Sequence, residues 1–180
     1  PFPSLLIFAP LGLLSSNVAH AIWLSLIELA LLASTLLWVS SIQWKWSSLM
    51  AAATLAFSAL WFPAFAAIVT AQYAAIEALV LALCLAAIRA GRNAVGGILL
   101  AASLFKPHLG IGFVVYIVVW AILVRRRTLL GWFVTSLVAL GGTSLFVDPS
   151  WPAGMARQII EYLALPVSLS PLARLAGSLG

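Results

Sequence analysis

The stretch Phe105-Lys106-Pro107-His108 interrupts an almost entirely apolar segment that runs from Ala94 to Val124. A charge at membrane depth is costly unless it is paired or hydrated, so an ionisable residue there marks a functional-site hypothesis. Proline removes a backbone donor and breaks a helix. We therefore expect two helices to meet at this break, with Lys106 and His108 forming the floor of a polar pocket. The alternative, a loop lysine beside an interfacial histidine, stays open on the sequence alone.

The composition is that of a membrane protein. Hydrophobic residues make up 64% and charged residues 7% of the 180 residues, against about 25% charged in soluble domains. The net charge of +5 fits basic residues that anchor cytoplasmic loops. No nucleic-acid motif, P-loop or GxGxxG is present, so we expect no nucleic-acid partner. Cys84 is the one cysteine, and no disulfide is expected within the chain.

Apolar runs predict an all-α fold, a polytopic bundle of transmembrane helices with short broken helices facing an outer cavity. A full span needs about 20 apolar residues, and several runs are shorter. Because the chain starts Pro-Phe-Pro-Ser, we expect residues 1–180 to be a single transmembrane domain cut from a longer protein. An amphipathic surface helix is expected at 153–165. The expected spans are 18–40, 49–62, 74–88, 94–104, 109–124 and 128–147.

Basic turns predict which helix ends lie on the same side of the membrane. Under the positive-inside rule, Lys45, the Arg89/Arg92 pair and Arg125–Arg127 belong to the cytoplasmic side. The spans then alternate. A single kinked helix over 93–124 is disfavoured, because it would put Arg92 and Arg125 on opposite sides. Four segments fall on the extracytoplasmic side: 1–16, 64–73, 105–108 and 148–152.

Three acidic residues have roles that the sequence leaves open. Glu28 lies within the first full span, where it is interpreted as a buried, protonated structural acid. Glu77 lies within 74–88, and Asp148 lies in an outer turn. In the span over 128–147, Gly141-Gly142 is expected to permit close helix contact.

Lys106 and His108, with the Gln72 amide on the same face, suit an anionic oxygen cluster such as a phosphate. Lysine binds phosphate as a point charge, and histidine adds a donor that titrates near neutral pH. At membrane depth such an anion arrives on a lipid. No metal is expected, because two distant histidines and one mid-helix cysteine make no ligand set. No cofactor and no serine-centred triad are expected either.

Short motifs follow one another in a familiar order. Pro1-Phe2-Pro3, Phe8-Ala9-Pro10-Leu11 and Ala21-Ile22-Trp23 resemble a "YPP … PL … lW" opening, and Ala71-Gln72-Tyr73-Ala74 resembles a "GQxN" element. Arg89-Ala90-Gly91-Arg92, Val95-Gly96-Gly97 and Phe105-Lys106-Pro107 resemble an "aG…la…KP" element, followed by the basic turn Arg125–Arg127. Together, over about Pro1 to Gly142, they resemble glycosyltransferase family 87, membrane enzymes of the GT-C fold.

The resemblance implies a multi-pass enzyme of the bacterial inner membrane. It would transfer a sugar, often mannose, from a polyprenyl-phosphate donor to a glycolipid or glycan acceptor outside the membrane. Carried over, Lys106 would contact the donor phosphate with His108 as a helper, and Gln72 would occupy the polar position of the "GQxN" element. In that element Ala71 replaces Gly and Ala74 replaces Asn, which weakens the prediction of a direct sugar contact.

The resemblance leaves the catalytic residue of this chain unknown. The family's general base, an acidic residue on the first large outer loop, would lie upstream of Pro1. A general base must reach the proton that it takes, and no acid here matches that position. This chain would therefore supply the donor-lipid half of the site and be inactive alone.

Two other functions stay open. A transporter or lipid-flippase segment would use broken helices and a mid-membrane lysine equally well. Transporters often have repeated halves, however, and no second copy of the Lys-Pro-His break is present in the sequence. A structural membrane subunit would use Lys106 only to pair with Glu77 or to reach the headgroups.

Overall fold

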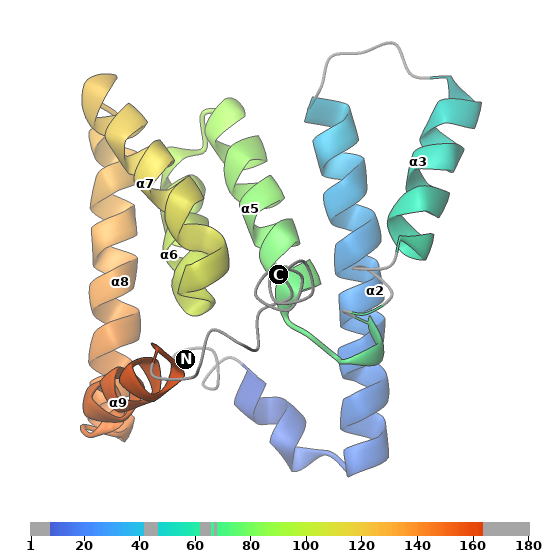
Figure 1. Cartoon of the computed structure of the whole chain (residues 1–180). Coiled ribbons are helices and arrows are strands. Elements are labelled where there is room, and N and C mark those ends of the chain that lie inside the picture. The colour runs from blue at the N-terminus through green and yellow to red at the C-terminus, as the bar shows by residue number, and fades with distance from the viewer. Residues whose placement is uncertain (1–7, 42–46, 62–65, 67, 164–180) are drawn as a thin grey trace, which may run out of the picture.

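The computed structural model describes residues 8–41, 47–61, 66 and 68–163, and the regular structure in these residues is helical. Successive helices run in opposite directions, and α9 lies across the end of α8 (Figure 1). The elements are η1 (Ala9–Leu13), α2 (Ser16–Ser41), α3 (Ser48–Leu60), α5 (Ala74–Arg89), α6 (Asn93–Ala102), η2 (Ser103–Phe105), α7 (Pro107–Leu123), α8 (Arg127–Val147) and α9 (Trp151–Leu163).

The six ranges predicted as spans are occupied by α2, α3, α5, α6 with η2, α7 and α8. Among the described helices, α2 and α8 are long and apolar enough to cross a membrane. The others are shorter. With 10 residues, α6 is about 15 Å long, half of a hydrocarbon core of about 30 Å. The all-α class is confirmed for the described residues, and a multi-pass arrangement stays a prediction.

The turns α5–α6 and α7–α8 share one backbone geometry. The φ angle is +74° at Gly91 and +57° at Arg125. The next residue in each turn, Arg92 or Arg126, donates its N–H to the carbonyl five residues earlier at 2.8 Å. This left-handed capping motif satisfies the last carbonyls of a helix. The helix stop predicted at Arg89–Arg92 is confirmed.

Close contact between α6 and α8 brings these two turns to one end of the molecule. A Cβ atom on Gly97 would lie 2.5 Å from the Leu129 carbonyl oxygen and 2.8 Å from the Phe133 nitrogen. Both helices therefore touch near their first turns, while the Lys106 break lies at the opposite end (Figure 1). The chain reverses at Lys106, as the sequence predicts. Lys45 lies outside the described residues.

The sequence predicted close helix contact at Gly141-Gly142, but the structure has it at other glycines. A Cβ atom on Gly141 or Gly142 would meet no described atom within 4 Å. The glycines that allow close packing are instead Gly97 and Gly110, because these two face a neighbouring backbone. The prediction for Gly141-Gly142 is therefore wrong for this part of the chain.

Two apolar clusters hold the helices together. Cys84, Leu100 and Leu129 belong to the cluster that joins α5, α6, α7 and α8. Ile27 belongs to the cluster that joins α2 to α5. Its neighbour Glu28 is exposed, because adjacent residues of a helix point in different directions. The interpretation of Glu28 as a buried structural acid is wrong.

Candidate functional site

The site is built on the break between α6 and α7. Lys106 leaves the helical conformation, with φ −123° and ψ 77°, and Pro107 begins α7. The Lys106 carbonyl accepts the N–H groups of Leu109 at 2.9 Å and Gly110 at 3.3 Å. Proline suits the first helical position, where its missing donor is not needed. The predicted helix break at Lys106 is confirmed, and the lysine side chain there is half-buried.

Glu77, in the first turn of α5, packs against this break. Its side chain is 1% exposed, and neither carboxylate oxygen has a hydrogen-bond partner among the described residues. Leaving a buried acceptor unpaired costs about 1–3 kcal/mol, and more for a charged group. A Cβ atom on Gly110 would lie 3.0 Å from Glu77 Oε1. The carboxylate therefore occupies space that the missing side chain of Gly110 leaves free.

Lys106 and Glu77 interact electrostatically without direct contact. The charge of Lys106 acts on the Glu77 carboxylate. The two side chains nevertheless form no ion pair within 4.0 Å. Direct pairing of Lys106 with Glu77, which the structural-subunit alternative predicts, is therefore not found.

An apolar cavity of about 300 Å³ lies on another side of the same break. Lys106 stands between two of its lining residues, Phe105 and Pro107. This cavity is distinct from the expected polar pocket, because its wall is made of apolar side chains; the polar pocket at Lys106 and His108 stays a prediction. Trp151, from α9, also lines it, and its buried indole N–H has no acceptor in the described part of the chain. The lining residues are Ala101, Leu104, Phe105, Pro107, Leu137, Leu140, Gly141, Trp151 and Met155.

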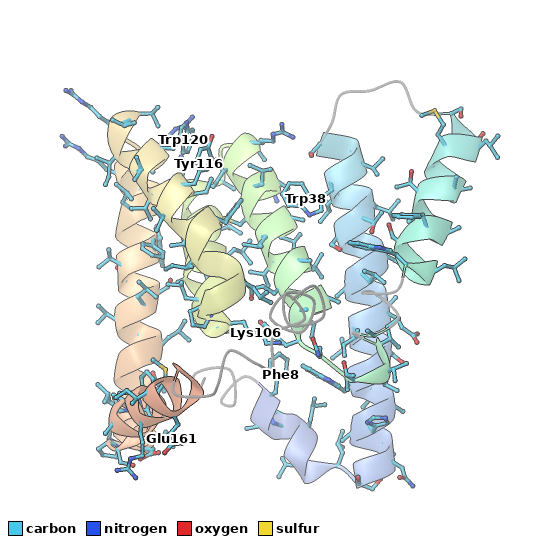
Figure 2. All side chains as sticks on the ribbon, viewed as in Figure 1. Phe8, Trp38, Lys106, Tyr116, Trp120 and Glu161 are labelled. Carbon is cyan, nitrogen blue, oxygen red and sulfur yellow. The ribbon has the colours of Figure 1, made fainter. Side chains whose placement is uncertain are left out.

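The roles predicted for His108 and Gln72 at this site stay predictions, whereas Asp148 makes structural contacts. His108 is the second residue of α7, but its side chain lies outside the described set. Gln72 is exposed in the turn before α5, and the first turn of α5 lies toward the same end of the molecule as Lys106 (Figure 2). Asp148 has a structural role, because its Oδ1 accepts the N–H of Ser150 at 2.9 Å and the Ser150 hydroxyl at 2.7 Å. These bonds fix the turn that leads into α9.

An aromatic cluster that the sequence did not predict lies at this same end. Phe8 meets Trp23 and Tyr73 edge-on, with ring centroids 5.0 and 5.9 Å apart. Figure 2 shows Phe8 and Lys106 at one end, with Tyr116 and Trp120 toward the other. Burial, and less strongly the charge of Glu77, raises the pKa of Tyr73 to about 12. The Tyr73 hydroxyl therefore stays neutral at physiological pH.

The cluster also fixes the backbone before α5. The indole N–H of Trp23 donates to the Ala71 carbonyl at 2.9 Å. Ala71 has φ +50°, in the left-handed region that favours glycine. In the sequence, Trp23 stood out only as part of the Ala21-Ile22-Trp23 motif. The sequence did contain a signal of this unusual backbone, because Ala71 occupies the glycine position of the "GQxN" element.

These features describe a helical membrane-type protein with a cation beside an apolar cavity. The chain matches glycosyltransferase family 87 over residues 1–177, and it belongs to this family. The resemblance drawn from the short motifs is confirmed. No significant match to a curated protein or to a solved structure was found. Membership indicates a membrane glycosyltransferase, which needs a sugar donor and an acceptor.

Proposed function

We propose that this chain forms the donor-binding part of a glycosyltransferase that uses a polyprenyl-phosphate sugar. The sugar, mannose by expectation, passes to a glycolipid or glycan acceptor on the extracytoplasmic side of the bacterial inner membrane. The observation that carries the proposal is the half-buried Lys106 between Phe105 and Pro107, both of which line an apolar cavity. A polyprenyl phosphate combines one anionic head with an apolar chain, and this site offers a cation and an apolar cavity side by side.

Lys106 has a clear chemical role in such a transfer. The acceptor hydroxyl attacks the anomeric carbon, the bond from that carbon to the phosphate oxygen breaks, and the hydroxyl proton leaves to a base. Negative charge then builds up on the departing polyprenyl phosphate. A cation fixed at that position stabilises the transition state more than the ground state. The base that takes the proton is not assigned to any residue of this chain.

The cavity gives the lipid chain a place next to the phosphate. Its wall comes from α6, η2, α7, α8 and α9, and it is apolar throughout apart from the indole N–H of Trp151. In the described part of the chain that N–H has no acceptor, so an oxygen of the bound lipid is proposed to accept from it. His108, in the first turn of α7, is assigned as a second phosphate donor. Gln72 is assigned to the sugar or acceptor side of the site.

The first test is binding of a polyprenyl phosphomannose to the whole protein in lipid nanodiscs. We expect Lys106→Ala to weaken binding about 10- to 100-fold, because a hydrogen bond to a charged group contributes about 1.5–3 kcal/mol. Arg92→Ala is the charge-matched control, since Arg92 is exposed at the opposite end, and it should bind like the wild type. Equal affinity of the Lys106→Ala variant and the wild type would refute the phosphate role.

A second pair of variants tests the cavity. Gly141 lines it and Gly142 does not, and neither has an atom close to its Cβ position. Gly141→Leu should fill part of the cavity and weaken lipid binding, whereas Gly142→Leu should leave binding unchanged. Equal binding by the two variants would move the lipid chain away from this cavity.

A further inference from the structure

We propose that Glu77 is a positioning residue for Lys106, and that its carboxylate takes up one proton when an anionic ligand neutralises the lysine. This rests on the proposed function only in assuming that Lys106 binds the phosphate of the ligand. It assigns to Glu77 a role that the sequence left open. No direct contact between Lys106 and Glu77 has to break, because the two side chains form no ion pair within 4.0 Å.

The first observation is the isolation of the carboxylate. Both oxygens of Glu77 are buried and lack a hydrogen-bond donor among the described residues. More than nine in ten buried polar groups in native proteins are hydrogen-bonded, so an unsatisfied one requires an explanation. Two conditions remove the problem: a nearby positive charge, or protonation of the carboxylate. The described structure offers the first, and solvent offers the second.

The second observation is that the break at Lys106 has a place for this carboxylate. Gly110 donates its N–H to the Lys106 carbonyl, so both residues belong to the same turn. A side chain at position 110 would collide with the Ser103 carbonyl and approach Glu77 Oε1 to 3.0 Å. Glycine at this position therefore lets the carboxylate lie against the turn that carries the lysine.

Among the described residues, Lys106 is the cation that acts on Glu77. Tyr73 stays neutral. His20 and Glu28 of α2 are exposed, as is Tyr116 of α7. Cys84, two turns further along α5, donates to the Gly96 carbonyl at 3.4 Å. The described helix α6 contains no titratable residue. His108 is the remaining titratable group on α7, and the experiment below treats it separately.

The coupling between ligand binding and protonation of Glu77 follows from these neighbouring groups. Without ligand, the positive charge of Lys106 acts on the buried carboxylate from beyond ion-pair distance, and the ionised carboxylate attracts the lysine toward the break. When a phosphate neutralises Lys106, the buried carboxylate loses the effect of that positive charge. It then takes one proton from solvent, which forms an O–H bond on Glu77 and changes no other bond. Because binding takes up a proton, affinity rises as the pH falls, by up to about tenfold per pH unit. Release of the ligand returns the proton.

The experiment is titration calorimetry on the whole protein in nanodiscs, with polyprenyl phosphomannose as the ligand. Its phosphodiester has no proton to titrate near neutral pH, so any proton taken up belongs to the protein. Measuring the binding heat in two buffers with different ionisation enthalpies gives the number of protons. We measure from about pH 5 to pH 8 and expect the wild type to take up protons on binding, with affinity that falls as the pH rises. If the wild type takes up no proton on binding anywhere in this pH range, the proposal is overturned, and no variant is needed for this test.

The variants assign the proton to a residue. Glu77→Gln should bind the ligand with a flat pH profile and no uptake, while Glu161→Gln, an exposed carboxylate of α9, should behave like the wild type. Uptake that persists in Glu77→Gln and disappears in His108→Gln would assign the proton to His108 and refute the role of Glu77. If Lys106→Ala binds like the wild type, the proposed function fails. Binding that needs Lys106 but takes up no proton overturns the Glu77 inference alone.

Discussion

Replacing Gly110 by alanine tests how tightly the chain reverses at the Lys106 break. The new Cβ atom would overlap the Ser103 carbonyl oxygen and lie 3.0 Å from Glu77 Oε1. A backbone carbonyl and a buried carboxylate cannot rotate away as the tip of a flexible side chain can. Overpacking of this kind costs about 1–3 kcal/mol, against a helix-propensity gain of up to about 1 kcal/mol. We expect a net loss of about 1–2 kcal/mol in unfolding free energy.

The matched control lies two residues further along the same helix. A Cβ atom on Gly112 would meet nothing within 4 Å, so Gly112→Ala should gain about 0.5–1 kcal/mol from helix propensity. The two variants should therefore differ by about 1.5–3 kcal/mol. At roughly 2–4 °C per kcal/mol for a chain of this size, their Tm values should differ by roughly 3–12 °C.

Heating the whole protein in one detergent while following tryptophan fluorescence measures this difference. Equal Tm values for Gly110→Ala and Gly112→Ala would refute the reasoning. Glu77 would then not lie against the first turn of α7, and the proton linkage would lose its geometric basis. If only Gly110→Ala is destabilised, the affinity of this variant for the polyprenyl-phosphate sugar should fall as well, because the same turn carries Lys106.

Arg125→Gly should raise the Tm by about 2–4 °C, because the +57° backbone angle at Arg125 costs a non-glycine residue about 1 kcal/mol. Gly91→Ala, in the matching turn, should lower the Tm by a similar amount, and the opposite sign for either would contradict the shared turn geometry. Ala71→Gly should likewise raise the Tm, for φ is +50° there; an unchanged or lower Tm would argue against that backbone. A cysteine replacing Arg126 should react with impermeant reagents only from the cytoplasm, and one replacing Asp148 only from outside. The reverse labelling pattern would invert the proposed orientation.

The order and ends of the helices could be predicted because they depend on local chemistry. Proline at position 107 and glycine at position 91 mark a helix start and a helix stop by their own backbone preferences. The apolar runs between them are long enough to identify as helices. These signals sit in neighbouring residues, so no knowledge of the tertiary structure is needed to read them.

The burial of the acidic residues could not be predicted in this way. Glu28 and Glu77 each lie in an apolar helix with no distinguishing neighbours in the sequence. Glu28 is exposed and Glu77 is buried, because only Glu77 lies against the turn at Gly110. Which face of a helix meets a partner depends on packing between distant segments. The glycine pair 141–142 was misinterpreted for the same reason.

The two residues that depart from the "GQxN" element, Ala71 and Ala74, occupy different structural positions. At Ala71 the backbone is left-handed and is held by the bond from Trp23. A glycine at that position meets a backbone requirement, so Ala71 affects stability and removes no side-chain contact. Ala74 differs, because it begins α5, three residues before Glu77. An asparagine there would add an amide at the end of the molecule that carries Lys106. The proposed weakening of a sugar contact would therefore rest on Ala74 alone, and the role of Gln72 stays a prediction.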